Sequence, residues 1–259
     1  MRDKAEGFRS LHQRCFVIAN AWDAGSARIL AGLGFQALAT SSGAHAGTLG
    51  RRDGQVTREE ALAHARAIVE ATDLPVSADL ENCFADDPAQ AAETVRLAVE
   101  IGLAGCSIED ATRDRVYDFD HAVERVAAAR NSRLVLTARA ENFVRGRPDL
   151  DDTIKRLQAF EKAGADVLMA PGLPDLESVR RVCATLSKPF NFMAGIKGKS
   201  FSVAELQSAG VRRISLATSL WRVAMTGLID AAREVKERGT FGYVERSLAT
   251  AEIVKLTEK

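Results

Sequence analysis

The sequence has no excess of charge of either sign and no long apolar run. Lys plus Arg and Asp plus Glu each number 35, so no net field favours nucleic acid or an anionic membrane as a partner. No apolar run reaches the roughly 20 residues that span a bilayer. The first residues, MRDKAEGFRSLHQRC, lack the apolar segment of a signal peptide. We therefore expect a cytoplasmic protein that binds neither nucleic acid nor membrane.

Cysteine is also scarce, and the four cysteines contain no CxxC pair. They are scattered over the chain as Cys15, Cys83, Cys106 and Cys183. This spacing does not indicate a thiolate metal site or a disulfide framework. Reduced thiols fit the expected cytoplasmic location.

What the chain does contain is eight apolar, β-rich runs that alternate with helical patterns. A chain of 259 residues has the size of a (β/α)₈ barrel, about 250 residues. Amphipathic stretches at 57–71, 87–102, 150–163 and 217–237 predict helices, with a further helix at 241–256. The strands are predicted at 16–19, 35–40, 75–80, 104–108, 133–138, 165–169, 189–193 and 211–216.

Glycine-containing phrases recur before every second strand: AGLGF, VEIGLAG, EKAGAD and QSAGV. Each is typical of a helix that ends in glycine and is followed at once by a parallel strand. Eight units of strand and helix in one chain of this length favour a closed barrel over an open sheet. The sequence therefore predicts one α/β domain over 1–259, a (β/α)₈ TIM barrel with a C-terminal helical extension at 241–256.

Charged side chains follow several of these strands. Asp79 and Glu81 end the third strand and should point the same way, Glu109 ends the fourth, and Arg139 and Glu141 end the fifth. The carboxyl ends of barrel strands meet at one mouth. Neighbouring carboxylates cannot all ionise without a compensating cation, and oxygen ligands favour Mg²⁺ or Mn²⁺. The alternative is a set of solvated acids near helix starts.

Anion-binding groups are predicted at the same mouth. Arg139 at a strand end is suited to bidentate carboxylate binding, or else forms a salt bridge with a neighbouring acid. Residues 42–44, Ser-Gly-Ala, follow the second strand and can offer backbone N–H groups to a carboxylate. Asp53 lies in an Asp-Gly pair that is either a plain turn or part of the site.

Six segments, in order, resemble the isocitrate lyase/phosphoenolpyruvate mutase superfamily over nearly the whole chain. They are NAWDAGSARILAGLGFQALATSSGA, DLEN, GCSIED, TARAENF, DLDDTIKRLQAFEKAGADVLMAPG and PFNFMAG. The resemblance implies a (β/α)₈ barrel whose last barrel helix swaps between neighbouring subunits of a homotetramer, a dimer of dimers. It also implies a Mg²⁺-dependent lyase that forms an enolate from a small 2-oxo acid or a 2-hydroxy di- or tricarboxylate.

The resemblance also implies roles for individual residues. Asp79 would bind Mg²⁺ directly, and three further carboxylates would hold it largely through water, namely Asp53, Glu81 and Glu109. Ser42, Gly43 and Ala44 would cradle a substrate carboxylate opposite Arg139. The reaction would be C–C cleavage, or decarboxylation or hydrolysis of an oxaloacetate-like acid.

The chain departs from its relatives at the proton-transfer end of the site. Isocitrate and methylisocitrate lyases carry a Lys-(Lys/Arg)-Cys-Gly-His loop where this chain has EDATRDRVYDFDHAVERV. We therefore assign Arg139, Glu109 and Cys83 as catalytic, with Cys83 as a substitute proton donor, although a lone cysteine is more often a small buried residue. His45 is an alternative acid or base. Asn191 is expected to bind substrate from the wall of the pocket.

Three other functions remain open. The first is a phosphonopyruvate-type P–C bond enzyme, although 170–172 reads Ala-Pro-Gly where such relatives use His and Ser. The second is a phosphate-binding aldolase or isomerase that uses MAGIKGKS and ISLATS, although no lysine lies in a predicted strand. The third is a non-catalytic 2-oxo acid binding protein.

Overall fold

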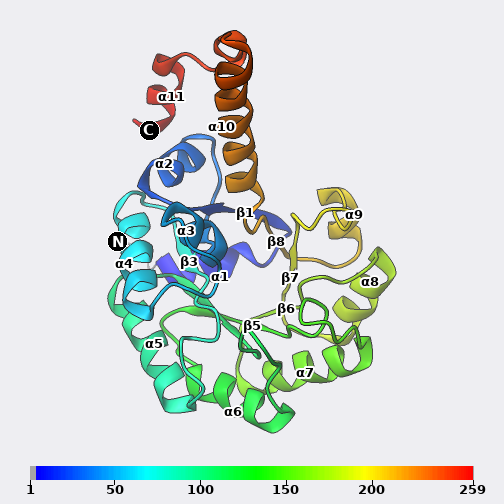
Figure 1. The fold of residues 1–259 in the computed structure, drawn as a ribbon. Coiled ribbons are helices and arrows are strands. Elements are labelled where there is room, and N and C mark those ends of the chain that lie inside the picture. The colour runs from blue at the N-terminus through cyan, green and yellow to red at the C-terminus, as the bar shows by residue number, and fades with distance from the viewer. Residues whose placement is uncertain (1–3, 259) are drawn as a thin grey trace.

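A closed barrel of eight parallel strands forms the centre of the computed structural model, which describes residues 4–258 (Figure 1). Each strand pairs with the next along the chain, and β8 closes on β1. The predicted (β/α)₈ fold class is confirmed. The predicted domain also includes residues 1–3 and 259, which lie outside the described residues.

Every predicted strand forms, and most are shorter than expected. Apolar residues beside the turns, such as Phe35 and Ala165, pack into the core without joining a strand. The strands are β1 Phe16–Ala21, β2 Leu38–Thr40, β3 Val76–Ala78, β4 Gly105–Glu109, β5 Val135–Arg139, β6 Val167–Met169, β7 Phe190–Met193 and β8 Arg213–Ser215.

The helices surround the barrel, and local capping fixes where several of them begin. Thr57 and Glu60 form a capping box at the start of α4, and Asp87 caps α5 directly before Pro88. The helices are α1 Lys4–Leu11, α2 Ala24–Gly32, α3 Ser42–Thr48, α4 Arg58–Glu70, α5 Pro88–Glu100, α6 Phe119–Ala129, α7 Leu150–Ala163, α8 Leu176–Thr185, α9 Val203–Ser208, α10 Ser219–Arg238 and α11 Thr250–Thr257.

The amino-terminal end of the barrel is closed by an apolar plug. Phe8 of α1 packs edge-on against Phe16, with 6.4 Å between the ring centroids. Both rings belong to a buried cluster with Val135 and Val167, the first residues of β5 and β6. The carboxyl-terminal end is therefore the end through which a ligand can enter the barrel.

The predicted C-terminal helix is confirmed, but it does not run continuously over 241–256. A 3₁₀ helix over Gly242–Arg246 is followed by an extended turn at Ser247 and Ala249, and α11 begins only at Thr250. The Glu252 carboxylate accepts the Ala249 N–H at 3.0 Å, which stabilises the new helix start. α11 then packs against α2.

The preceding helix, α10, projects away from the barrel (Figure 1) and buries none of its residues. Within residues 4–258, no helix is long and apolar enough to span a membrane. Several large apolar side chains of α10 are exposed, among them Val223, Leu228 and Ile229.

Gly105 of β4 provides a test of how tightly the plug is packed. A Cβ there would lie 2.8 Å from both the Phe8 ring and the Val135 carbonyl oxygen, and 3.1 Å from Ser77 Oγ. We predict that Gly105→Ala lowers the free energy of unfolding by about 1–3 kcal/mol in urea denaturation. Gly7→Ala on α1 is the control, because nothing lies within 4 Å of its Cβ. Equal losses in the two variants would contradict the packing argument.

Candidate active site

A cavity of about 310 Å³ opens at the carboxyl-terminal end of the barrel. All eight strands, or the loops that follow them, contribute to its wall. Examples in strand order are Asn20, Ser42, Asp79, Glu109, Arg139, Met169, Asn191 and Ser215. Below the rim the wall stays polar, with Ser77, Ser107, Thr137 and Arg213, where barrels of this type usually carry branched apolar side chains.

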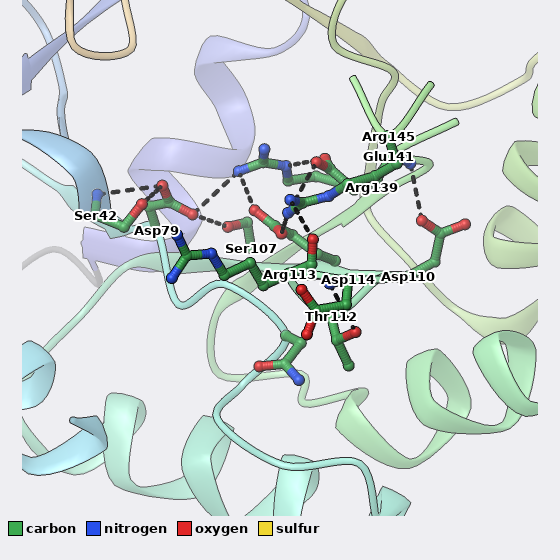
Figure 2. Close-up of polar contacts among 12 residues, drawn as sticks. Ser42, Asp79, Ser107, Asp110, Thr112, Arg113, Asp114, Arg139, Glu141 and Arg145 are labelled. Carbon is green, nitrogen blue, oxygen red and sulfur yellow. Dashed lines mark hydrogen bonds and ion pairs between the residues drawn. The ribbon is translucent and has the colours of Figure 1, made fainter. Parts of the chain in front are cut away.

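Arg139 lies at the centre of an ion-pair network at the rim. Its Nη1 lies 3.1 Å from Asp79 Oδ1 and 3.0 Å from Glu109 Oε1, and its Nε lies 2.9 Å from Glu141 Oε1 (Figure 2). Burial opposes the charged form of Arg139, but the three carboxylates outweigh burial and raise its pKa. The guanidinium therefore holds together carboxylates from three successive strands.

Arg145, which the sequence interpretation missed, adds a second cation to this network. Its Nη2 lies 3.3 Å from Glu109 Oε2 and 3.8 Å from Glu141 Oε2. It comes from the loop after β5, four residues beyond Glu141. The spacing of four residues between Glu141 and Arg145 could have indicated this contact, because side chains four residues apart in one turn lie close enough to form an ion pair.

Asp79 is held by hydroxyl and amide donors as well as by Arg139. Its Oδ2 accepts the Ser42 N–H at 3.3 Å and the Ser42 hydroxyl at 3.0 Å (Figure 2). Its Oδ1 accepts the Ser107 hydroxyl at 3.1 Å. Ser107, which lies two residues before Glu109 on the same face of β4, was also missed, although strand alternation places it there.

Residues 42–44 form the first turn of α3, where a loop was expected. Ser41 caps this helix, and its hydroxyl accepts the Ala44 N–H at 3.3 Å. Ser42 and Gly43 line the cavity, whereas Ala44 is buried behind them and absent from the wall. The structure therefore argues against the predicted role of Ala44 in substrate binding, because this residue does not reach the cavity wall.

Glu81 does not share a strand face with Asp79, contrary to the prediction. β3 ends at Ala78, and the Glu81 backbone has a left-handed φ of 51°. This turn places its side chain against a second, adjoining cavity of about 910 Å³ that also contains Asp53 and Glu109. Asp53 lies on the wall of both cavities.

One oxygen of the Glu81 carboxylate lacks a partner in the part of the chain that the structure describes. Burial, then the charges of Asp79 and Asp53, raise its pKa to about 7. Its Oε1 is buried with no hydrogen-bond partner among residues 4–258. Burial likewise raises the pKa of Glu109, even beside Arg139. Such groups are stabilised as carboxylates only if a further positive charge approaches.

The donor set fits a hard divalent cation. Carboxylates gather at the rim, where Asp53, Asp79, Glu109 and Glu141 line the rim cavity and Glu81 lines the adjoining one. Their oxygen atoms are the donors that Mg²⁺ prefers. In residues 4–258 no three acidic, histidine or cysteine side chains already form an ion-binding group, since Arg139 bonds to Asp79 and Glu109 instead.

Cys83 lies away from the cavity, which argues against its predicted role as proton donor. It is fully buried in the apolar core, and its Sγ faces the Ser107 carbonyl oxygen at 3.9 Å. Burial raises its pKa to about 12. The wall of neither large cavity includes it.

Asn191 lines the cavity as predicted, and its amide is oriented by two neighbours. Its Nδ2 donates to Ser215 Oγ at 3.0 Å, and its Oδ1 accepts from Arg213 Nε at 2.8 Å. His45 is not on the cavity wall and stacks on His64, with 3.8 Å between ring centroids. Within residues 4–258, no lysine lines the rim cavity, which disfavours a Schiff-base aldolase.

The barrel and its carboxylate-lined mouth define a TIM-barrel enzyme class with an active site at the carboxyl ends of the strands. Residues 8–236 match the family model described as phosphoenolpyruvate phosphomutase. The chain belongs to this family and, with it, to the phosphoenolpyruvate mutase/isocitrate lyase superfamily. The predicted resemblance is confirmed.

Three relatives illustrate the range of this superfamily. A solved structure from Burkholderia cenocepacia J2315, described as either a lyase or a mutase, is 44% identical with a TM-score of 0.94, covering 97% of this chain and 94% of that one. The 2,3-dimethylmalate lyase of Eubacterium barkeri is 27% identical over 92% of this chain and 87% of its own. Rv1998c of Mycobacterium tuberculosis H37Rv, a protein without an assigned function, is 29% identical over 89% of each chain.

Arg125 of α6 supports this site from behind. Its guanidinium is buried and donates to the carbonyl oxygens of Glu109 at 3.0 Å, Ala85 at 2.7 Å and Asp86 at 3.2 Å, and also to that of Asn82. The loop that it holds contains Glu81, Cys83 and Phe84, all with positive φ. Non-glycine residues keep this conformation only where the surroundings impose it.

We predict that Arg125→Met destabilises the protein by roughly 2–5 kcal/mol, because it leaves buried carbonyl groups without donors. Urea denaturation measures this loss, and hydrogen exchange should show faster opening of the amides at 81–87. Arg133→Met, at an exposed position, is the control and should change neither quantity. Unchanged exchange at 81–87 in a folded Arg125→Met protein would contradict the role of this arginine.

Proposed function

We propose that this chain is a Mg²⁺-dependent carbon–carbon lyase that acts on a small 2-oxo acid or 2-hydroxy di- or tricarboxylate through an enolate. Members of the superfamily are lyases and mutases and are generally Mg²⁺-dependent. Relatives of this chain include 2-methylisocitrate lyase, 2,3-dimethylmalate lyase and oxaloacetate decarboxylase. The observation that carries the proposal is the cluster of rim carboxylates, with the Glu81 Oε1 atom left without a partner among residues 4–258.

Four carboxylates would hold the ion. Asp79, Asp53 and Glu109 line the rim cavity, and Glu81 lines the adjoining cavity together with Asp53 and Glu109. When bound, Mg²⁺ supplies Lewis-acid stabilisation of negative charge on the 2-oxo oxygen. If Asp79 and Glu109 held the ion, Arg139 would keep Glu141 as a partner and would have N–H groups free to donate to a substrate carboxylate.

The amides of Ser42 and Gly43 support the same end of the substrate. Glycine suits position 43 because a Cβ would crowd two side chains, at 3.1 Å from Thr218 Cγ2 and 3.4 Å from the Asp53 carboxyl carbon. Fixing the substrate carboxylate between these groups aligns the bond that breaks. A P–C bond reaction is second choice, because Met169 and Pro171 of the cavity wall offer no side-chain donors to a phosphonate.

Asp79→Asn tests the metal role. We expect it to lower Mg²⁺-dependent turnover by at least about 100-fold, because the variant loses the central anionic ligand. A screen of C₃–C₇ oxo and hydroxy acids that detects pyruvate, glyoxylate or CO₂ measures the wild-type activity first. Asp120→Asn on the exposed face of α6 is the control and should match the wild type. Full metal-free activity in Asp79→Asn would refute the proposal.

We also propose that α10 is exchanged between two subunits, as the resemblance to the superfamily implies. The support is its unpartnered apolar surface, with Val223 70%, Leu228 61% and Ile229 47% exposed. Exposed apolar patches of this kind mark protein interfaces.

We expect analytical ultracentrifugation to show a dimer or tetramer at micromolar concentration. Leu228→Asp should shift the protein toward monomer, since a carboxylate is costly to bury in such an interface. The exposed Glu237→Asp change near the end of the same helix should leave the mass unchanged. A monomeric wild-type protein would disprove the exchange.

A further inference from the structure

Arg213 of β8 lies inside the barrel, below the ring of rim carboxylates. It is 4% exposed, and the cavity wall includes it. Its Nε donates to Asn191 Oδ1 at 2.8 Å and its Nη2 to Thr137 Oγ1 at 2.8 Å, while its Nη1 lies 3.4 Å from His12 Nε2. Burial, and then Arg213 itself, lower the His12 pKa to about 3, so this ring is neutral.

No carboxylate balances the charge of Arg213. Within residues 4–258 it forms no ion pair, and burial lowers its pKa to about 9 with no acid to oppose the effect. Arg139 differs, because three carboxylates surround it. A buried guanidinium without a counter-charge is costly, and proteins keep such groups paired or use them to bind anions.

The surroundings leave Arg213 open toward the mouth. Phe8 and Phe16 close the barrel below it, so an anion can reach it only through the rim cavity. A guanidinium has five N–H donors, and the three acceptors named above leave two for a ligand. Two parallel N–H groups are the usual means by which arginine binds a carboxylate.

The spacing to the rim suits a molecule with two anionic ends. Thr137, which accepts from Arg213, and Arg139 lie two residues apart on the same face of β5. At about 3.3 Å per residue, the two levels are separated by roughly 7 Å. A short dicarboxylate can extend over that distance.

We propose that Arg213 binds the second carboxylate of the substrate at the floor of the cavity and thereby selects short dicarboxylates over monocarboxylates. The assignment rests on the proposed function for the first carboxylate, which lies at the rim near Arg139. Its hydrogen bonds to Asn191, Thr137 and His12 keep the Arg213 side chain in place when no anion is bound. A dicarboxylate is then preferred because a monocarboxylate leaves the positive charge of Arg213 unpaired.

Calorimetry with two unreactive probes tests this assignment. Succinate and propionate are titrated into the wild type, with and without Mg²⁺. In Arg213→Gln, which keeps amide donors but loses the charge, we expect succinate to bind at least about tenfold more weakly. Propionate should change less than about twofold, because it needs only the rim. The control is Arg133→Gln, which removes the same charge from an exposed position and should bind both probes as the wild type does.

Equal succinate affinity in Arg213→Gln and wild type would overturn the assignment. A parallel tenfold loss for propionate would also overturn it, because the variant would then have damaged the rim. Circular dichroism checks folding, and if Arg213→Gln is unfolded, Arg213→Lys serves in its place. Arg213→Lys keeps the charge but loses the paired donors, so we expect an intermediate loss for succinate alone, and no loss would count against the assignment.

This experiment is independent of turnover. Succinate binding depends on Arg213 whether or not Asp79→Asn abolishes activity. A protein that fails the Mg²⁺ test and passes the succinate test has a dicarboxylate site without the proposed lyase chemistry. If the protein passes the Mg²⁺ test but succinate binding does not depend on Arg213, the lyase proposal is supported and Arg213 has no role in substrate binding.

Discussion

The site depends on the contact of one guanidinium with the carboxylates of three neighbouring strands. Without Arg139, Asp79, Glu109 and Glu141 would lie close together and repel one another at the end of the barrel. Arg139 holds the three carboxylates close together through ion pairs, which can be exchanged for other cationic partners. The same contact explains why the mouth can be built from β3, β4 and β5 in succession, since parallel pairing brings their ends into register.

The fold could be predicted well from the sequence because a barrel alternates an apolar strand with a helix eight times. The glycine phrase before every second strand adds the same information each time, so an error in one unit does not change the predicted fold class. The C-terminal segment lacked such repetition. Its apolar spacing favoured one helix over 241–256, but the backbone at Ser247 and Ala249 is extended, and α11 docks on α2 instead.

The site was predicted only in part, for reasons visible at single residues. Asp79, Glu109, Arg139 and Asn191 reach the cavity because strand alternation determines their direction. Glu81, Cys83 and Ala44 do not follow that rule, since they lie in a left-handed turn and in a helix start. Arg213 and Ser107 obey the alternation but were overlooked, because polar residues inside a barrel strand are unexpected when the interior is assumed to be apolar.

The polar interior of the barrel has a consequence for how the protein can change. Its main apolar core lies between the strands and the surrounding helices, with Leu38, Ile108, Leu136 and Leu168 facing outward into that layer. The polar side chains of the cavity wall, above the plug formed by Phe8 and Phe16, therefore contribute little to the hydrophobic stabilisation of the fold. Residues of the cavity wall can be exchanged during evolution at a small cost in stability, and a new specificity can arise on an unchanged scaffold.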